Sequence, residues 1–483
     1  MAIRPPAAID PATLRDRSEL LVARQLYEPL LRFDPETLEL KSGIARSWDV
    51  LDGGSRFVFH LRPDARFHDG HPVTAQDAAF ALSRLVRRET GSELSFLLEA
   101  VAGFAAVRAG EAAELEGVRA LDEVTLEVRI ATPWVDFPYV LSHPATAPVP
   151  KQGLALDPVG FARKPAGSGA YRVAKPWKPG GDLVLEATPG SRGTPRVRFV
   201  AIADPDGGWA DLQAGRVDIA EVPPGKLAEA RNRYGTAGFS PVAAGVYLGF
   251  NLKGPKLADL AVRRAVSLAI DRTAIADQVY EEVLVPATSI VPVGIPGRNE
   301  MACGPLCKHD PDGARALLAQ APAGPVTIAF DYPAGATQDA LAAAIEHNLA
   351  DVGIQLQPRP HPLPEFLDLL EAEGQESFRI LWVAEYPLAD WFLTPLFAPG
   401  ARDNHTGYAA PEVGDLLARA RSAPGREERL RLYREAEARV MQDLPVVPIG
   451  FFRNHYAARP DVRGLNVDQL GAFDIDRLTL RAP

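Results

Sequence analysis

The sequence contains no long hydrophobic run and none of the patterns that commonly mark a catalytic centre. No stretch of about 18 consecutive apolar residues occurs, so no membrane-spanning helix is predicted. The nine histidines are scattered and form no His-Glu-x-x-His pattern, which argues against a zinc-binding helix. The Gly167-Ser168-Gly169 run lacks the spacing of a Gly-x-Ser-x-Gly nucleophile elbow. The sequence therefore predicts a protein that is not an enzyme and that has no metal or other cofactor.

The chain also has no net positive charge and only two cysteines. The 483 residues carry a formal net charge of −10, which argues against a nucleic-acid partner because such partners require a basic surface. The composition, 47% hydrophobic and 24% charged, is that of a globular protein, and the length predicts two or three domains. Cys303 and Cys307 are separated by Gly-Pro-Leu, a turn that would bring both sulfurs together as a disulfide. Free thiols are an alternative, and a metal site would need two further ligands, of which His309 supplies at most one.

The remaining pattern predicts mixed α/β structure. Residues 45–50 and 56–61 alternate like the strands of a hairpin, and residues 74–77 offer a capped start for a helix that reaches residue 85. A helix over about 338–351, a strand over 354–357 and a strand over 378–383 predict a second α/β region. Residues 133–150 are rich in proline and aromatic residues, and we expect them to be irregular and to lie on the surface.

The strand over 378–383 is followed by the most informative polar residues of the chain. Arg379, Trp382 and Glu385 lie three residues apart. Odd spacing on a strand places successive side chains on opposite faces, so only a strand that ends near Trp382 directs all three to one cavity. Such a cavity would offer a cation, a flat apolar wall and an anion to a small, doubly charged ligand. The alternative is a core strand with solvated charges at its ends.

Residues 382–387, Trp-Val-Ala-Glu-Tyr-Pro, resemble the Trp-x-x-Asp-Tyr-Pro-Asp-Pro segment of the family-5 extracellular solute-binding proteins of peptide, oligopeptide and nickel ABC importers. Further stretches match that family's motifs: residues 33–35, 47–50, 67–70, 73–77, 167–171, 250–252 and 262–272. The match over 250–272 is the most specific. Glu385 stands where the family has Asp, and Leu388-Ala389 stands where it has Asp-Pro.

The resemblance implies an α/β, two-lobe fold like that of the periplasmic binding proteins (type II, large peptide-binding subclass), with hinge strands between the lobes. Lobe I is expected to comprise residues 1–246 and 452–483, including a subdomain at about 40–165, and lobe II residues 247–451. A ligand would be captured as the lobes close around it. The implied function is the substrate-binding protein of an ABC importer, with a small solute, foremost a short peptide, as ligand and the permease subunits as partners of a monomer.

By the same resemblance, Glu385 is expected to hold a ligand amine, Arg379 a ligand carboxylate, and Trp382 to line the site. The additional glutamate methylene shifts the amine pocket or makes it shallower. The other expected ligand-binding residues are Tyr386, Tyr247, Arg17, Ser18, Trp391 and Asn404. For Arg17 the alternative is an ordinary solvated charge, and for Tyr247 it is a core tyrosine with a bonded hydroxyl.

The family is extracellular or periplasmic, and residues 1–6 show no apolar segment of a signal peptide. We therefore expect a signal or lipid anchor that is absent from this sequence and that places the protein at the membrane periphery. One alternative is a cytoplasmic ligand-sensing domain of a transcriptional regulator. Another is a nickel-chelate or haem importer component, for which His405 is the one plausible cleft histidine.

Overall fold

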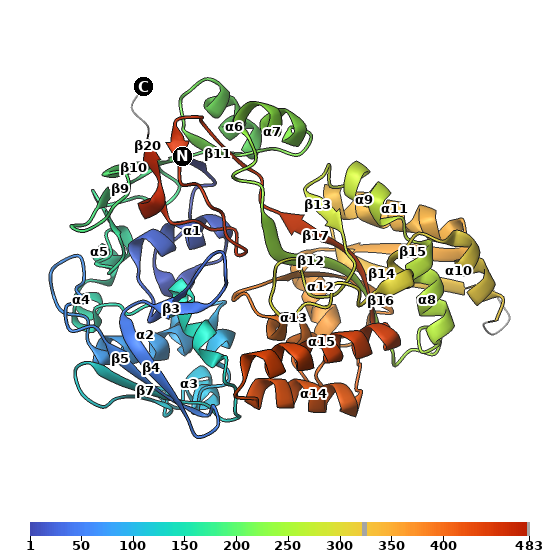
Figure 1. Ribbon diagram of the computed structural model, residues 1–483, viewed down its shortest axis with the longest axis horizontal. Coiled ribbons are helices and arrows are strands. Elements are labelled where there is room, and N and C mark those ends of the chain that lie inside the picture. Colours follow the sequence, from blue (N-terminus) through green and yellow to red (C-terminus); the bar gives the residue numbers. More distant parts are fainter. Residues whose placement is uncertain (321–325, 481–483) are drawn as a thin grey trace. The chain divides into compact units, whose positions relative to one another are not determined.

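The computed structural model describes residues 1–320 and 326–480, which form two compact units (Figure 1). Unit 1 contains Met1–Ser240 and the segment that begins at Asn454, and unit 2 is Pro241–Arg453. The predicted lobe boundary at 246/247 falls inside a strand that starts at the unit boundary. The parts of the predicted lobes at 321–325 and 481–483 lie outside the described residues. Within the described residues, no helix is long and apolar enough to cross a membrane.

Unit 1 is built on two four-stranded sheets, with strand orders β1-β10-β9-β8 and β4-β5-β7-β6. Its strands are β1 (Ala2–Ile3), β2 (Leu31–Phe33), β3 (Leu40–Ser42), β4 (Ala45–Leu51), β5 (Arg56–Leu61), β6 (Val118–Ala120), β7 (Thr125–Arg129), β8 (Tyr171–Val173), β9 (Leu183–Ala187), β10 (Arg196–Ala201), β11 (Ile219–Glu221), β18 (Tyr456–Ala458), β19 (Val462–Arg463) and β20 (Thr479–Leu480). Its helices are α1 (Arg17–Leu26), α2 (Ala75–Val86), α3 (Phe104–Ala109), α4 (Lys151–Leu156), α5 (Pro158–Arg163), α6 (Pro205–Gln213) and α7 (Leu227–Tyr234).

Local sequence signals account for several of these elements. Thr74 and Asp77 form a capping box, in which each side chain accepts a hydrogen bond from the other residue's backbone N–H, so α2 begins where the sequence predicts. Strands β4 and β5 pair in an antiparallel hairpin across a turn in which Asp52, Gly53 and Gly54 have positive φ. The predicted alternation of strands and helices is therefore present in unit 1.

The surface position predicted for residues 133–150 is wrong. Residues 136–150 are buried throughout, and most of them lie in two short 3-10 helices, Phe137–Ser142 and Pro144–Thr146. The Tyr139 hydroxyl donates to the carbonyl of Leu38 at 2.8 Å. The segment is buried in spite of its prolines, because burying its aromatic and aliphatic side chains removes much apolar surface from water.

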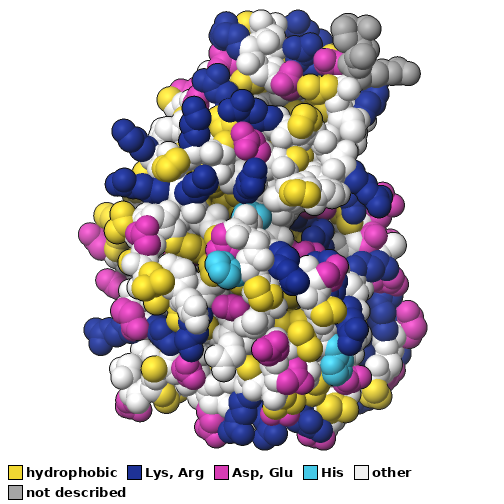
Figure 2. Space-filling view, turned by 90° about the vertical axis from the view of Figure 1, so that its left-hand side faces the viewer, with side chains coloured by type: hydrophobic (Ala, Val, Ile, Leu, Met, Phe, Trp, Pro, Cys, Tyr) yellow, Lys and Arg dark blue, Asp and Glu magenta, His cyan; other side chains and the backbone are white. Residues whose placement is uncertain are grey.

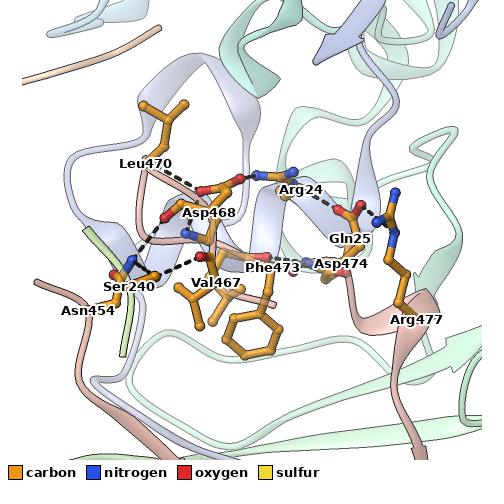
Figure 3. Close-up of polar contacts among 12 residues, drawn as sticks. Arg24, Gln25, Ser240, Asn454, Val467, Asp468, Leu470, Phe473, Asp474 and Arg477 are labelled. Atoms are coloured by element: carbon orange, nitrogen blue, oxygen red, sulfur yellow. Dashed lines mark hydrogen bonds and ion pairs between the residues drawn. The ribbon is translucent and has the colours of Figure 1, made fainter. Parts of the chain in front are cut away.

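The C-terminal segment of unit 1 is fastened to helix α1 by buried polar side chains (Figure 3). Asp468 forms an ion pair with Arg24 and accepts the backbone N–H groups of Leu470 and Ala472. The Asn454 amide donates to the Asp468 carbonyl and to the Ser240 hydroxyl, both at 2.9 Å. These bonds fix the two points at which the chain leaves and re-enters unit 1.

Unit 2 contains one mixed six-stranded sheet in the order β13-β17-β12-β16-β14-β15 (Figure 1). Its strands are β12 (Pro241–Phe250), β13 (Leu284–Pro286), β14 (Val326–Pro333), β15 (Ile354–His361), β16 (Ser377–Val383) and β17 (Val446–Arg453). Its helices are α8 (Leu260–Ala269), α9 (Arg272–Gln278), α10 (Pro311–Leu318), α11 (Ala336–Ala350), α12 (Leu363–Glu371), α13 (Ala389–Phe397), α14 (Pro411–Ser422) and α15 (Arg426–Asp443).

Candidate ligand-binding site

Strand β16 carries Arg379 and Trp382 on opposite faces of the sheet. It pairs with β12 in an unbroken antiparallel register, in which Arg379 lies opposite Leu248 and Trp382 lies opposite Gly245. Because the strand runs to Val383, it does not end near Trp382, the condition under which both side chains would share a cavity. Within unit 2 the structure therefore does not bring the predicted cation and the predicted aromatic wall together.

Arg379 is a buried cation that has no acidic partner among the described residues. Its residue is 8% exposed, and its Nε has no hydrogen-bond partner within the described residues. The hydroxyl of Tyr280, two residues beyond helix α9, is buried next to it and meets the geometry of a hydrogen bond with no group in the described part of the chain. Burial lowers the pKa of Arg379 and raises that of Tyr280, and the proximity of the two groups opposes both shifts. This pair leaves donor groups available for an anion.

An apolar strip continues from Arg379 along the same face of β16. Leu381 and Val383 share that face, because they alternate with Trp382, and they are 45% and 43% exposed. Exposed aliphatic side chains next to a buried, unpaired donor are typical of ligand sites, which combine mostly apolar walls with a few polar groups. Tyr280, Leu381 and Val383 are thus site candidates that the sequence patterns did not single out.

Trp382, Tyr386 and Trp391 form an aromatic cluster at the end of the same strand. The rings of Trp382 and Trp391 are stacked with centroids 5.6 Å apart, and Tyr386 packs edge-on against Trp391 at 4.9 Å. The Trp382 indole donates to the Trp391 carbonyl, and the Trp391 indole donates to the Val383 carbonyl, both at 2.8 Å. The reciprocal bonds hold both indoles in fixed orientations.

Glu385 lies in the turn between β16 and helix α13, after Trp382 and directly before Tyr386. Its side chain is half-buried, and the turn is fixed to β12 by the backbone N–H of Ala384, which donates to Ala243 at 2.8 Å. The carboxylate is therefore presented from a short, anchored turn next to Tyr386. Trp382, Tyr386 and Trp391 are the predicted site residues that the structure does bring together, and Glu385 precedes Tyr386 in the same turn.

Helix α13 is held in place by a buried carboxylate. Asp390 is 0% exposed and receives two hydrogen bonds from the Arg421 guanidinium of α14, at 2.8 and 2.7 Å. The hydroxyls of Thr394 and of Tyr433 on α15 also donate to it. Burial alone would lower the pKa of Arg421, but the charge of Asp390 raises it above its usual range. Asp390 thus fixes the helix that carries Trp391.

The structure places Tyr247 and Asn404 in supporting positions. Tyr247 is 1% exposed and donates its hydroxyl to the Ile290 carbonyl at 2.6 Å. The Asn404 side-chain amide donates to the carbonyls of Ala398 and Tyr408, and its oxygen accepts the Thr406 hydroxyl. Both side chains are occupied by bonds within unit 2.

Arg17 and Ser18 lie at the start of α1 in unit 1. The exposed Arg17 donates to the Asn454 side-chain oxygen at 2.6 Å, and the half-buried Ser18 hydroxyl donates to Asp16, the N-cap of the helix, at 2.6 Å. The guanidinium also lies so close to Gly471 that a side-chain carbon there would collide with it. Arg17 is therefore positioned, rather than free to move in solvent.

Cys303 and Cys307 are joined by a disulfide at the 3-10 helix Gly304–Cys307, with Cα atoms 5.5 Å apart. A separate cavity of about 720 Å³ lies in unit 1 at the edge of β10, between Met1 and β20. None of the predicted site residues lines it. At its rim, Arg198 is paired with Asp182, and the walls are mainly aliphatic.

Behind Tyr247, Glu437 on α15 holds the loop that follows β13. Its carboxylate accepts the N–H groups of Ile290 and Val291 at 2.8 Å and that of Asn299 at 2.7 Å. Burial raises the pKa of Glu437 to about 7, although the three N–H groups act in the opposite direction.

This shift predicts a pH dependence of stability. Because the native pKa lies above the value of about 4.5 in the unfolded chain, the native state binds the proton more tightly between these values. The contribution of Glu437 to the unfolding free energy should be fully present below about pH 4.5 and fall by about 3 kcal/mol as the pH rises to about 7. Urea unfolding across this range should show the fall in the wild type and lose it in Glu437→Gln. The exposed Glu435→Gln on the same helix is the control, and equal slopes in all three proteins would contradict the prediction.

The chain forms two α/β units, which are joined at 240/241 and 453/454. One sheet of unit 2 carries a buried unpaired cation and a fixed aromatic wall. This architecture is that of a two-lobe binding protein of the periplasmic type. Residues 39–404 match the bacterial extracellular solute-binding proteins, family 5, and the chain belongs to that family. This confirms the family and the fold class that the sequence motifs indicate.

Relatives that align with nearly the whole chain are binding proteins of the same kind. The probable deoxycholate-binding periplasmic protein YgiS of Escherichia coli is 28% identical, over 92% of this chain and 86% of its own. The periplasmic oligopeptide-binding protein OppA of the same organism is 27% identical, over 95% and 87%. The crystal structure of Haemophilus influenzae OppA in complex with RPPGFSPFR superposes with a TM-score of 0.75 and 25% identity, over 99% of this chain and 98% of its own. The family and these relatives confirm the predicted function, a substrate-binding protein of an ABC importer. They favour neither the regulator domain nor the nickel-chelate or haem importer component.

Proposed function

We propose that the protein captures short peptides through both their charged ends and delivers them to the permease subunits of an ABC importer. It acts as a monomer and a binding protein rather than an enzyme, outside the cytoplasm and attached to the membrane by an anchor. Family membership and the oligopeptide-binding relatives support this class of ligand. The single observation that carries the proposal is the buried Arg379, which lacks an acidic partner.

A buried guanidinium without a carboxylate carries an uncompensated desolvation cost. The carboxylate of a peptide offsets that cost, because it accepts charge-assisted hydrogen bonds from Arg379 and can receive the Tyr280 hydroxyl. Leu381 and Val383 supply the adjacent apolar contact. Arg379 is therefore assigned to a ligand carboxylate.

Glu385 is assigned to the ligand amine. It is half-buried in an anchored turn next to the aromatic cluster, of which the partly exposed Trp382 offers its ring to a cationic or apolar group. Trp382 lines this part of the site, on the sheet face opposite Arg379, and the buried Trp391 and Tyr386 support it. Arg17 and Ser18 contribute contacts from unit 1, whereas Tyr247 and Asn404 act by holding the site's loops.

The test is calorimetric titration with one tetrapeptide in three forms: free, N-acetylated and C-amidated. Acetylation removes the amine charge, so it should weaken binding to the wild type by roughly 30-fold or more, because the ion pair between the amine and Glu385 is lost. Glu385→Gln should bind the free peptide more weakly and distinguish it far less from the acetylated form.

Exposed Glu371→Gln on α12 is the matched control and should behave like the wild type. Equal affinity of the wild type for all three forms would contradict the assignment of both charged ends. Recovery of only sugars or metal chelates with the purified protein would contradict peptides as the ligand class.

A further inference from the structure

One stretch of unit 1 is basic, although the chain as a whole is acidic. Residues 151–181 contain six Lys or Arg, one Asp and no Glu, whereas the whole chain has a net charge of −10. The stretch includes α4, α5 and β8. Figure 2 shows that Lys and Arg side chains are spread over this side of the molecule among apolar and acidic ones. A basic surface on an acidic protein orients it toward anionic partners.

Four of these cations meet at the end of α5. Arg163 and Lys164 end the helix, and the backbone N–H of Trp177 donates to the Arg163 carbonyl at 2.8 Å. That bond brings the loop with Lys175 and Lys178 against the helix end. All four side chains are exposed, and within residues 1–320 and 326–480 none forms an ion pair or a hydrogen bond. Their charge is therefore not neutralised within the protein.

Two aliphatic side chains project beside these cations. Leu156 is 86% exposed and Val159 is 62% exposed. Val159 lies four residues before Arg163, so both share one face of α5. The exposure is not the result of a loose segment, because Leu154 and Phe161 of the same helices are buried in the unit 1 core. The acidic residue of the stretch, Asp157, caps α5 by accepting the Gly160 N–H at 2.8 Å.

We propose that this α5 patch, consisting of Leu156, Val159, Arg163, Lys164, Lys175 and Lys178, docks on the surface of an anionic phospholipid bilayer. The two aliphatic side chains enter the boundary between headgroups and acyl chains. The four cations contact the lipid phosphates, while the acidic remainder of the protein is repelled. The docking is independent of the captured solute.

A bilayer fits this patch better than a protein partner does. Two exposed aliphatic side chains fall far short of the roughly 1,000 Å² that a specific protein interface buries. Peripheral membrane binding needs only a small apolar contact that basic residues reinforce. The combination of a projecting apolar tip and surrounding unpaired cations therefore points to lipid.

Vesicle flotation tests the proposal. The wild type should float with vesicles that contain about one-third phosphatidylglycerol and not with pure phosphatidylcholine vesicles, and binding should weaken as salt is raised from about 0.1 M to about 0.5 M. The double variant Lys175→Ala, Lys178→Ala should bind the anionic vesicles roughly 30-fold more weakly. Leu156→Asp should also lose binding, because it places an acid at the apolar tip.

The control is Leu363→Asp with Leu367→Asp on α12, where two exposed leucines lie among acidic residues. This variant should float like the wild type. The substituted side chains are all exposed, and an unchanged melting temperature establishes that each variant is folded. Equal binding to both kinds of vesicle, no binding by the wild type, or undiminished binding by the lysine variant would overturn the proposal. Stable capture of a protein through the patch without lipid would overturn it in favour of a protein interface.

Discussion

Replacing Asp390 by alanine should lower the unfolding free energy of unit 2 by about 3 to 5 kcal/mol. The carboxylate is fully buried and holds Arg421, Thr394 and Tyr433 together. Alanine would leave the Arg421 guanidinium largely buried without its counter-charge. The free-energy cost of that unpaired buried charge exceeds the net stabilisation that the ion pair provides. Because α13 carries Trp391, the aromatic cluster should become mobile as well.

Hydrogen–deuterium exchange of α13 to α15 in increasing urea measures this effect in unit 2 alone. Glu435→Ala on α15 is the matched control, because it breaks an exposed ion pair with Arg431. This control should leave the transition unchanged. If Asp390→Ala unfolded at the same urea concentration as the control, the buried pair would not be what fixes these helices.

Replacing Arg379 by methionine should separate binding from stability. Affinity for a tetrapeptide with a free carboxylate should fall by roughly 30-fold or more, because the ligand loses its buried cationic partner. The ligand-free protein should be as stable as the wild type or more stable, because an unpaired buried charge is replaced by a side chain of similar shape. Calorimetric titration and thermal unfolding without ligand measure the two effects.

Arg359→Met on β15 is the control for this prediction, since Arg359 is an exposed arginine of the same sheet. It should change neither quantity appreciably. A loss of stability in Arg379→Met with unchanged peptide affinity would assign Arg379 to the structure of unit 2 rather than to the ligand.

Local signals made much of the fold predictable. The capping box at Thr74 and the hairpin turn at residues 52–54 act over a few residues, so their patterns identify α2 and the β4–β5 pair directly. Whether residues 136–150 are buried depends on the other parts of unit 1 that pack over them. Their prolines predicted an irregular path, but only the packed unit shows that this path is interior.

The site was predictable only in part for the same reason. Glu385 and the aromatic residues lie close in sequence and remain close in space. Arg379 and Trp382 are just as close in sequence, but the point at which β16 ends decides whether they share a face, and the spacing does not fix that point. Tyr280 reaches Arg379 from a distant part of the chain, so no local pattern reveals it. Asp390 offered a weak signal, as an acidic residue in an otherwise apolar helix.

The reciprocal indole bonds of Trp382 and Trp391 have a chemical consequence for selectivity. Each indole has one N–H group, and both groups are donated to carbonyls inside the protein. In the proposed site the partly exposed Trp382 ring, which the buried Trp391 supports, offers a ligand carbon and π-electron density, which distinguish ligands by size and contour but hardly by their polar functional groups. If peptides bind there as proposed, such a surface should accept glutamine, leucine or threonine side chains with similar affinity.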